Sequence, residues 1–116
     1  MITVYGLKNC DTCKKVLKAV AGQNLAHVFV DIRAEADLSA KVPGWLNAAG
    51  SKFLLNTRST TWRNLSDDDK AQAETAPASL LIANPTLIKR PVIEMGDDIH
   101  VGWTTSVQGD VLGASA

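Results

Sequence analysis

The 116-residue chain has few features of exported, membrane-bound or nucleic-acid-binding proteins. Its 12 basic and 12 acidic residues leave no net charge, which removes the usual electrostatic argument for nucleic acid or an anionic membrane as a partner. No apolar run approaches the ~18 residues that a membrane helix needs. The N-terminus MITVYGL has no basic segment followed by a long apolar stretch, so no signal peptide is expected. We therefore expect a cytoplasmic protein.

Cysteine is also scarce, since Cys10 and Cys13 in VYGLKNCDTCKKV are the only two in the chain. A permanent disulfide is not expected in a reducing cytosol, and so small a loop would stabilise the fold weakly. A structural zinc site needs four ligands. His27 and His100 are the only histidines, and neither stands in a ligand-spaced motif. Zinc is therefore the disfavoured alternative, and reactive thiols are the favoured one.

The length and the hydrophobic content of 46 % predict one domain, residues 1–116, with a core of its own. Residues 2–5 (ITVY) and 26–32 (AHVFVDI) have the β-branched or alternating pattern of strands. Between them, residues 11–21 place apolar side chains on one helical face and lysines on another. This order predicts a right-handed βαβ unit with parallel strands.

The remainder of the chain is predicted to be helical and then to form a hairpin. Helical spacing, an N-cap serine or a following Asn-Pro marks three helices, at residues 37–50, 66–72 and 77–84. Pro43 and Gly44 predict a break or kink in the first of them. An antiparallel hairpin and a weak last helix follow, at residues 91–95, 99–103 and 106–116. The order predicts an α/β, thioredoxin-like fold with a helical insertion between the βαβ unit and the C-terminal β-hairpin.

Cys10 is predicted to lie where the first strand meets the first helix. The unpaired N–H groups and the dipole of a helix N-terminus favour negative charge, so we expect a lowered thiol pKa there, with help from Lys8 and Lys14. Cys13 is one helical turn further on, close enough to attack a mixed disulfide at Cys10. The spacing indicates a nucleophile with a resolving thiol, and inert buried cysteines are the alternative. The neighbouring lysines are most simply a solvated helix face: Lys8, Lys14, Lys15 and Lys18.

Arginines stand at positions 58, 63 and 90 in LLNTRSTTWR and LIKRPVIE. Arg90 precedes Pro91 at the start of a predicted strand. In thioredoxin-like folds a proline in this place commonly takes the cis form and faces the catalytic cysteine. Guanidinium groups beside a thiolate lower its pKa and bind carboxylates or oxyanions bidentately. Surface arginines paired with the acidic run are the alternative, and Arg63 fits it best.

Four stretches in this order resemble the ArsC/Spx/YffB family of arsenate-reductase-like proteins: VYGLKNCDTCKK, LLNTRSTTWRNL, NPTLIKRPVIE and IHVGW. The resemblance spans residues 2–103 and is closest to the YffB branch. It implies a glutathione-dependent thiol reductase. In that family Cys10 matches the catalytic cysteine, Arg58 and Arg90 match two arginines of the arsenate site, and Pro91 matches the cis-proline beside it.

Two features leave other functions within this family open. The third arginine of authentic arsenate reductases would fall in HVGW, where there is none, and this argues against efficient arsenate reduction. A C-x-x-C pair also resembles Spx, a regulator that uses it as a redox switch while binding the RNA polymerase α subunit.

The favoured function is a monomeric thiol–disulfide reductase with glutathione as co-substrate and with neither a cofactor nor a metal. Cys10 is the predicted nucleophile and Cys13 the resolving thiol, while Arg58 and Arg90 support catalysis. The partner is glutathione or another small thiol or disulfide. Its binding residues are predicted to be Lys8, Asn9, Arg58, Arg90 and Pro91.

Overall fold

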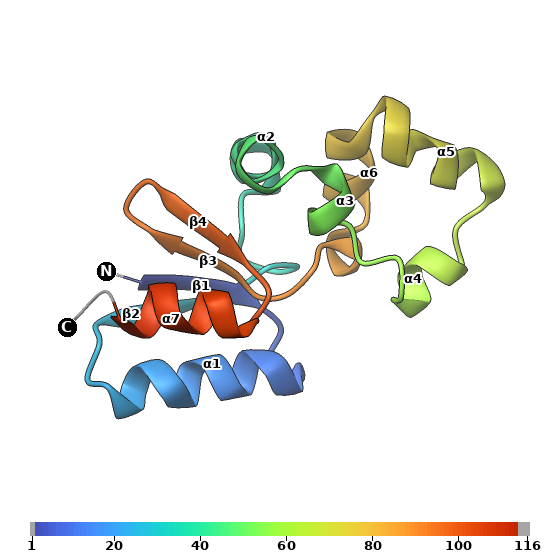
Figure 1. Cartoon of the computed structure of the whole chain (residues 1–116). Coiled ribbons are helices and arrows are strands. Elements are labelled where there is room, and N and C mark those ends of the chain that lie inside the picture. Colours follow the sequence, from blue (N-terminus) through green and yellow to red (C-terminus); the bar gives the residue numbers. More distant parts are fainter. Residues whose placement is uncertain (1, 114–116) are drawn as a thin grey trace. The chain divides into compact units, whose positions relative to one another are not determined.

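The computed structural model describes residues 2–113 (Figure 1), so residues 114–116 of the predicted last helix lie outside the described residues. The chain divides into two compact units. We call residues 2–35 with 90–113 the sheet unit and residues 36–89 the helical unit. The α/β, thioredoxin-like fold with a helical insertion is confirmed. The single domain over residues 1–116 stays a prediction.

The sheet unit contains the predicted βαβ unit and hairpin. Its elements are β1 (Ile2–Gly6), α1 (Asp11–Gly22), β2 (His27–Asp31), β3 (Val92–Met95), β4 (Asp98–Val101) and α7 (Thr105–Gly113). The strand order is β2-β1-β3-β4, with β2 parallel to β1 and with β3 antiparallel to β1 and β4. The hairpin turns at Gly96, whose φ of +61° is easily adopted by glycine.

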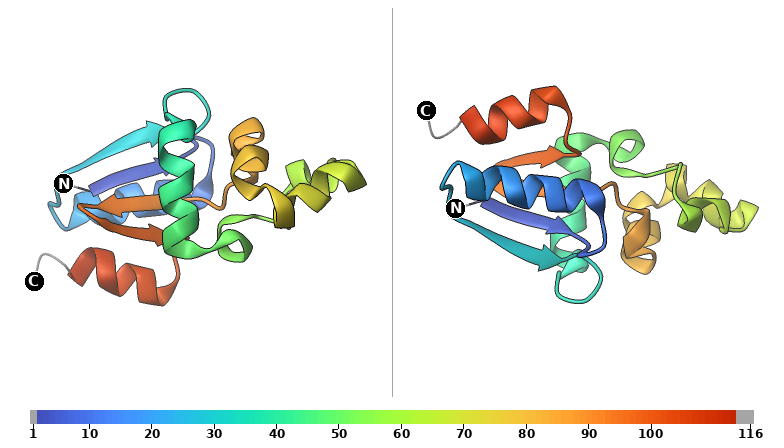
Figure 2. Two further views of the ribbon diagram at one scale, coloured as in Figure 1. Left: turned by 90° about the horizontal axis from the view of Figure 1, so that it is seen from above. Right: turned by 90° about the horizontal axis from the view of Figure 1, so that it is seen from below.

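One face of this sheet is covered by α1 and α7, which lie side by side in both figures (Figure 2). The core there is an aliphatic cluster: Ile2, Val4, Val16, Val20, Ile93, Val107 and Val111. Burial in β2 does not follow the predicted alternation of apolar and polar side chains. Phe29 packs against the cluster, whereas Val28 is 43 % exposed, because β2 is an edge strand.

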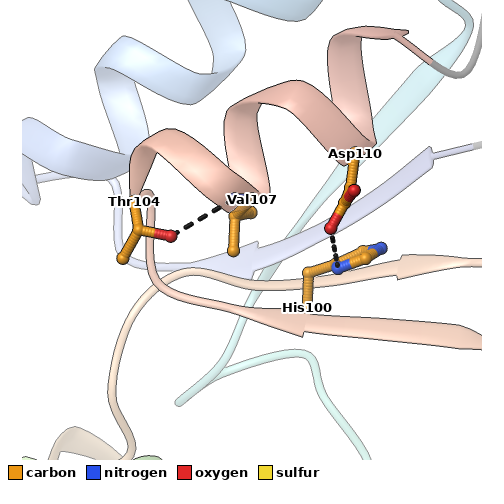
Figure 3. A network of polar contacts seen from close by, with 4 residues as sticks. All are labelled: His100, Thr104, Val107 and Asp110. Carbon is orange, nitrogen blue, oxygen red and sulfur yellow. Dashed lines mark hydrogen bonds and ion pairs between the residues drawn. The ribbon is translucent and has the colours of Figure 1, made fainter.

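Each of the two histidines has a polar contact within the sheet unit. His100 on β4 places Nδ1 3.9 Å from the Asp110 carboxylate on α7 (Figure 3). His27 Nδ1–H donates to the Leu25 carbonyl oxygen at 2.8 Å. Among residues 2–113, no group of three or more His, Cys, Asp and Glu side chains is placed to hold a metal.

The helical unit consists of short helices. They are α2 (Leu38–Ala49), α3 (Ser51–Leu54), α4 (Thr60–Arg63), α5 (Asp67–Thr75), α6 (Pro77–Ala83) and the 3₁₀ helix η1 (Pro85–Leu87). Ser66 caps α5 as predicted, accepting a hydrogen bond from the Asp69 N–H. An antiparallel bridge between Leu55 and Ile88 joins the residue after α3 to the end of the unit. Of the helices in the described part of the chain, none is long and apolar enough to cross a bilayer.

Of the break or kink predicted at Pro43, the break is wrong, since α2 runs from Leu38 to Ala49 without interruption. A proline at this position removes only the hydrogen bond to the Ser39 carbonyl. Ser39 is exposed, so water can bind that oxygen. The buried side chains of Val42 and Trp45, on either side of the proline, favour the continuous helix.

Candidate active site

The site begins with a tight turn that connects β1 to α1. The Cys10 N–H donates to the Leu7 carbonyl at 3.1 Å, so Lys8 and Asn9 occupy the corners of the turn. Both side chains are exposed beside Cys10. The structure therefore places these two predicted binding residues next to the predicted nucleophile.

Cys10 is the N-cap residue of α1, with extended backbone angles (φ −85°, ψ 119°). Burial raises the pKa of its thiol, but three groups stabilise the thiolate and outweigh burial. They are the backbone N–H of Cys13, the thiol of Cys13 and the Arg90 guanidinium, which together lower the pKa of Cys10 below its ordinary 9.0. The pKa moves in the predicted direction. Its cationic contribution comes from Arg90, one of the arginines that the sequence suggested, and not from Lys8 or Lys14.

Cys13 lies one turn into α1 and is almost completely buried, with 1 % of its surface exposed. The pKa of the Cys13 thiol is raised to about 12, mainly by burial. The neighbouring Cys10 also raises it, whereas the Leu7 N–H and Arg90 lower it. Both cysteines are free thiols. The pair thus combines an accessible sulfur that ionises readily with a buried sulfur that keeps its proton.

Gly6 provides the space in which the Cys13 sulfur lies. A Cβ atom at this position would overlap the Cys13 Sγ and come within 3.3 Å of its Cβ. The end of β1 and the first turn of α1 therefore approach so closely that only glycine fits without movement. Sequence reasoning missed this role. The only signal was a glycine that ends a strand just before the cysteine pair.

Replacing Gly6 with alanine should lower the free energy of unfolding by roughly 1–3 kcal/mol, because the added methyl group overpacks a closed site. Urea unfolding would measure the loss. Gly22→Ala is the matched control, since nothing lies within 4 Å of a Cβ there. The double variant Gly6→Ala/Cys13→Ala should be less destabilised than the sum of the single variants. Strictly additive effects would contradict the proposed contact.

Arg90 and Pro91 enter the site from the segment before β3. Their peptide bond is cis, which confirms the expectation for Pro91. Pro91 is buried, and its carbonyl oxygen accepts a hydrogen bond from the Gly102 N–H at 2.8 Å. Arg90 is half-buried, and its guanidinium lies close enough to hydrogen-bond to the Cys10 sulfur. Arg90, which is far from Cys10 in sequence, thus lies beside it.

Replacing Arg90 with methionine should raise the pKa of Cys10, because a hydrogen-bonding cation beside the thiolate is lost. Only the thiolate is alkylated, so the rate of Cys10 alkylation by iodoacetamide at pH 6 should fall roughly threefold to tenfold. The rate should reach the same plateau at high pH, with its midpoint moved upward. Mass spectrometry of the alkylated peptide gives the rate at each pH. Arg63→Met is the control, and an unmoved midpoint in Arg90→Met would contradict the assigned contact.

Arg58 belongs to the helical unit, where its side chain is exposed. Its backbone N–H donates to the Asn56 side-chain oxygen at 3.2 Å, which stabilises the turn after α3. It borders a cavity of about 370 Å³ whose rim also carries Lys52 and Lys89. The structure thus gives Arg58 a cationic setting within its own unit. Its predicted share in catalysis stays a prediction.

The chain is similar to known proteins over almost its whole length. The sequence model of the ArsC family matches residues 5–108. An uncharacterised protein of Haemophilus influenzae is 48 % identical over 109 residues, which cover 89 % of this chain and 91 % of the relative. The solved structure of a YffB protein superimposes with a TM-score of 0.85 at 32 % identity, covering 97 % of this chain and 99 % of the other. The regulatory protein MgsR of Bacillus subtilis is 27 % identical over 88 % of this chain and 82 % of its own.

Proposed function

Because this chain belongs to the ArsC family, we propose that it is a thiol–disulfide reductase that uses glutathione as its electron donor. One observation carries the proposal: the two thiols at the N-terminus of α1 have pKa values that move in opposite directions. A lowered pKa suits an attacking sulfur, and a protonated neighbour in contact with it suits a later, resolving step. An inert buried cysteine would account for the raised pKa of Cys13 but not for the lowered pKa of Cys10.

In the first step the Cys10 thiolate attacks one sulfur of a disulfide R–S–S–R′. A Cys10–S–S–R bond forms, the original S–S bond breaks, and R′–S⁻ leaves. Arg90 and the Cys13 N–H hold the negative charge at Cys10 before attack. Lys8 and Asn9, at the corners of the exposed turn, are positioned to contact the arriving disulfide.

In the second step Cys13 loses its proton and attacks the Cys10 sulfur. The Cys10–Cys13 disulfide forms and R–S⁻ leaves, taking up a proton from solvent. Charge on Cys10 helps to raise the pKa of Cys13, and that charge is gone once Cys10 is in a mixed disulfide. The resolving thiol therefore ionises more easily after the first step than before it.

Two glutathione molecules complete the cycle. The first attacks the Cys10–Cys13 disulfide and forms a mixed disulfide, and the second displaces it as glutathione disulfide, leaving both cysteines reduced. In this proposal Arg90 binds a glutathione carboxylate beside Cys10, and Pro91 shapes the surface next to it. Arg58 is a second candidate for carboxylate binding, on the family resemblance. The chain works as a monomer in this proposal.

The proposal is tested by coupling the reaction to NADPH and glutathione reductase, with a peptide–glutathione mixed disulfide as substrate. We expect NADPH oxidation in proportion to the protein added, and a rate that rises with the glutathione concentration. A thiol that lacks carboxylates, such as 2-mercaptoethanol, should support less turnover at equal concentration. For this comparison the release of the free peptide is followed by mass spectrometry with both thiols, because glutathione reductase does not reduce the disulfide of 2-mercaptoethanol. No turnover with any thiol would contradict the proposed reductase activity. Equal turnover with both thiols would contradict glutathione as the specific electron donor.

A redox-switched regulator is the second candidate, because the similarity to the regulatory protein MgsR extends over 88 % of this chain. In that case the Cys10–Cys13 pair would change a binding surface instead of turning over substrate. Its partner would be the RNA polymerase α subunit. Binding of the purified α subunit should then differ between the reduced and oxidised protein, and equal or absent binding in both states would exclude this candidate.

Arsenate reduction ranks third. Residues 100–103 (HVGW), at the end of β4 and just after it, are where the third arginine of true reductases is expected, and they contain none. A doubly charged oxyanion would therefore lack one of its cationic contacts. Arsenate turnover above that of Cys10→Ser, supported by glutathione and glutaredoxin, would reverse this order.

A further inference from the structure

A row of positive charge on α1 begins at the reactive thiol. Cys10, Lys14 and Lys18 are spaced by four residues and therefore follow one line along the helix surface. The helical spacing includes Cys10 itself, because the Lys14 N–H donates to the Cys10 carbonyl oxygen at 3.0 Å. Lys14 and Lys18 are both exposed, and we call them the α1 lysine row. Lys15, the neighbour of Lys14 in α1, is exposed too, as is Lys8 in the turn before the helix. Hydrogen bonds from backbone N–H groups lower the pKa of the Asp31 carboxyl, and Lys8 lies close enough to lower it further.

The charge here is strongly uneven for a chain that is neutral overall. Residues 8–18 contain four of the 12 basic residues of the protein and one acidic residue, Asp11, which gives them a net charge of +3. Figure 2 (right) shows α1 in front of its sheet, with α7 beside it. Lys14, Lys15 and Lys18 are exposed on this helix, whereas Cys13, Val16 and Val20 are its buried residues. Cys10 is half-exposed at the start of the row, so a partner with negative charge that contacts the lysines extends toward the reactive thiol.

The stability of α1 does not account for this arrangement. Like charges at positions i and i+4, as in Lys14 and Lys18, destabilise a helix. Cations are favourable near a helix C-terminus, yet the last turn of α1 has none and Lys14 lies near its N-terminus. The buried residues of the helix are Cys13, Val16 and Val20, so the lysines do not contribute to its packing against the sheet.

We propose that the α1 lysine row is a docking surface for an acidic polypeptide whose disulfide is presented to Cys10. The inference rests on the proposed function and names its substrate class: disulfides of polypeptides with acidic residues near the bonded cysteine. Opposite charges raise the encounter rate and set the direction in which the chain lies. The chemical step is unchanged, since the Cys10 thiolate displaces one sulfur of the disulfide as a thiolate.

The helix geometry also sets the spacing of the acidic residues. Lys14 and Lys18 lie about 6 Å and 12 Å from Cys10 along the helix axis, at a rise of ~1.5 Å per residue. An extended peptide advances ~3.3 Å per residue, so its acidic side chains belong about two and four positions from the cysteine. A tripeptide is too short for this, because its cysteine cannot lie at Cys10 while a carboxylate contacts Lys18. The row therefore fits a longer polypeptide.

The test uses three symmetric peptide disulfides that differ only in charge. Each peptide has one cysteine, with Glu, Gln or Lys at two and four positions on both sides of it. Formation of the protein–peptide mixed disulfide is followed by intact mass spectrometry in the full chain with Cys13→Ser. We expect the Glu peptide to react roughly tenfold faster than the Gln peptide at low salt, and the Lys peptide to be slowest. In 1 M NaCl the three rates should converge to within about twofold.

The decisive variant is Lys14→Glu/Lys18→Glu, in which the Glu peptide should lose its advantage and become slower than the Gln peptide. Lys52→Glu/Arg63→Glu is the matched control, because it changes the net charge equally at two exposed residues of the helical unit. There the order of the peptides should be kept. The readout is the rate with the Glu peptide divided by the rate with the Gln peptide. Any change in the ionisation of Cys10 affects both rates equally and cancels in this ratio.

Equal rates for all three peptides at low salt would overturn the docking surface. So would a preference for the Glu peptide that survives Lys14→Glu/Lys18→Glu or disappears in the control variant. Each of these results leaves the proposed reductase intact as long as the Gln peptide reacts. A protein that reacts with none of the three peptides would instead contradict the proposed function itself.

Discussion

Cys10→Ser should lower the rate of disulfide reduction by at least ~1000-fold, because a serine hydroxyl does not ionise near neutral pH and is a poor nucleophile toward sulfur. The substitution changes one atom at the half-exposed N-cap position of α1. Serine is itself a preferred N-cap residue, so the helix should keep or gain stability. The expected loss is therefore one of chemistry and not of fold.

The coupled assay with a peptide–glutathione mixed disulfide measures this loss, and thermal unfolding shows that the variant is folded. Cys13→Ser is the control. It also leaves the protein with a single cysteine, but that cysteine is the attacking one. Residual turnover by Cys10→Ser within tenfold of the unmodified protein would assign the first step to another group. Cys13 would then be the only remaining candidate, despite its burial and its raised pKa.

Cys13→Ser should stop the reaction after its first step and accumulate the mixed disulfide at Cys10. We expect turnover at low glutathione to fall roughly tenfold to hundredfold, because the bound resolving thiol has a far higher effective concentration than the free one. Raising the glutathione concentration should restore turnover, since external thiol can attack the mixed disulfide directly. Intact mass spectrometry detects the trapped species by its added mass.

A second variant, Cys13→Ala, is needed because a serine hydroxyl buried at this 1 % exposed site would lower the stability of the fold. Both variants should trap the same species. If neither accumulates a mixed disulfide and turnover is unchanged at every glutathione concentration, Cys13 is not the resolving thiol. The reaction would then use Cys10 alone, with glutathione as the resolving group.

Much of the fold follows from local patterns. The apolar run of β1, the one-sided apolar face of α1 and the serine cap of α5 depend on residues a few positions apart, and all were predicted correctly. The single-turn helices α3 and α4 were missed, because four residues are too few to show a helical period. The predicted break at Pro43 failed because burial of Val42 and Trp45 outweighs one lost hydrogen bond.

The sequence by itself determined which atoms can react and where they lie in the chain: two thiols one helical turn apart, at the junction of a strand and a helix, with lysines in line behind them. Those relations depend on helical spacing and on the charge at a helix N-terminus, which act over a few residues. Only the tertiary structure decided that Arg90 lies beside Cys10 and that Gly6 makes room for the Cys13 sulfur. Pairing of β1 with β3 and packing of α1 against the sheet bring these groups together. Contacts between such distant parts of the chain are fixed by burial and close packing, which no local pattern records.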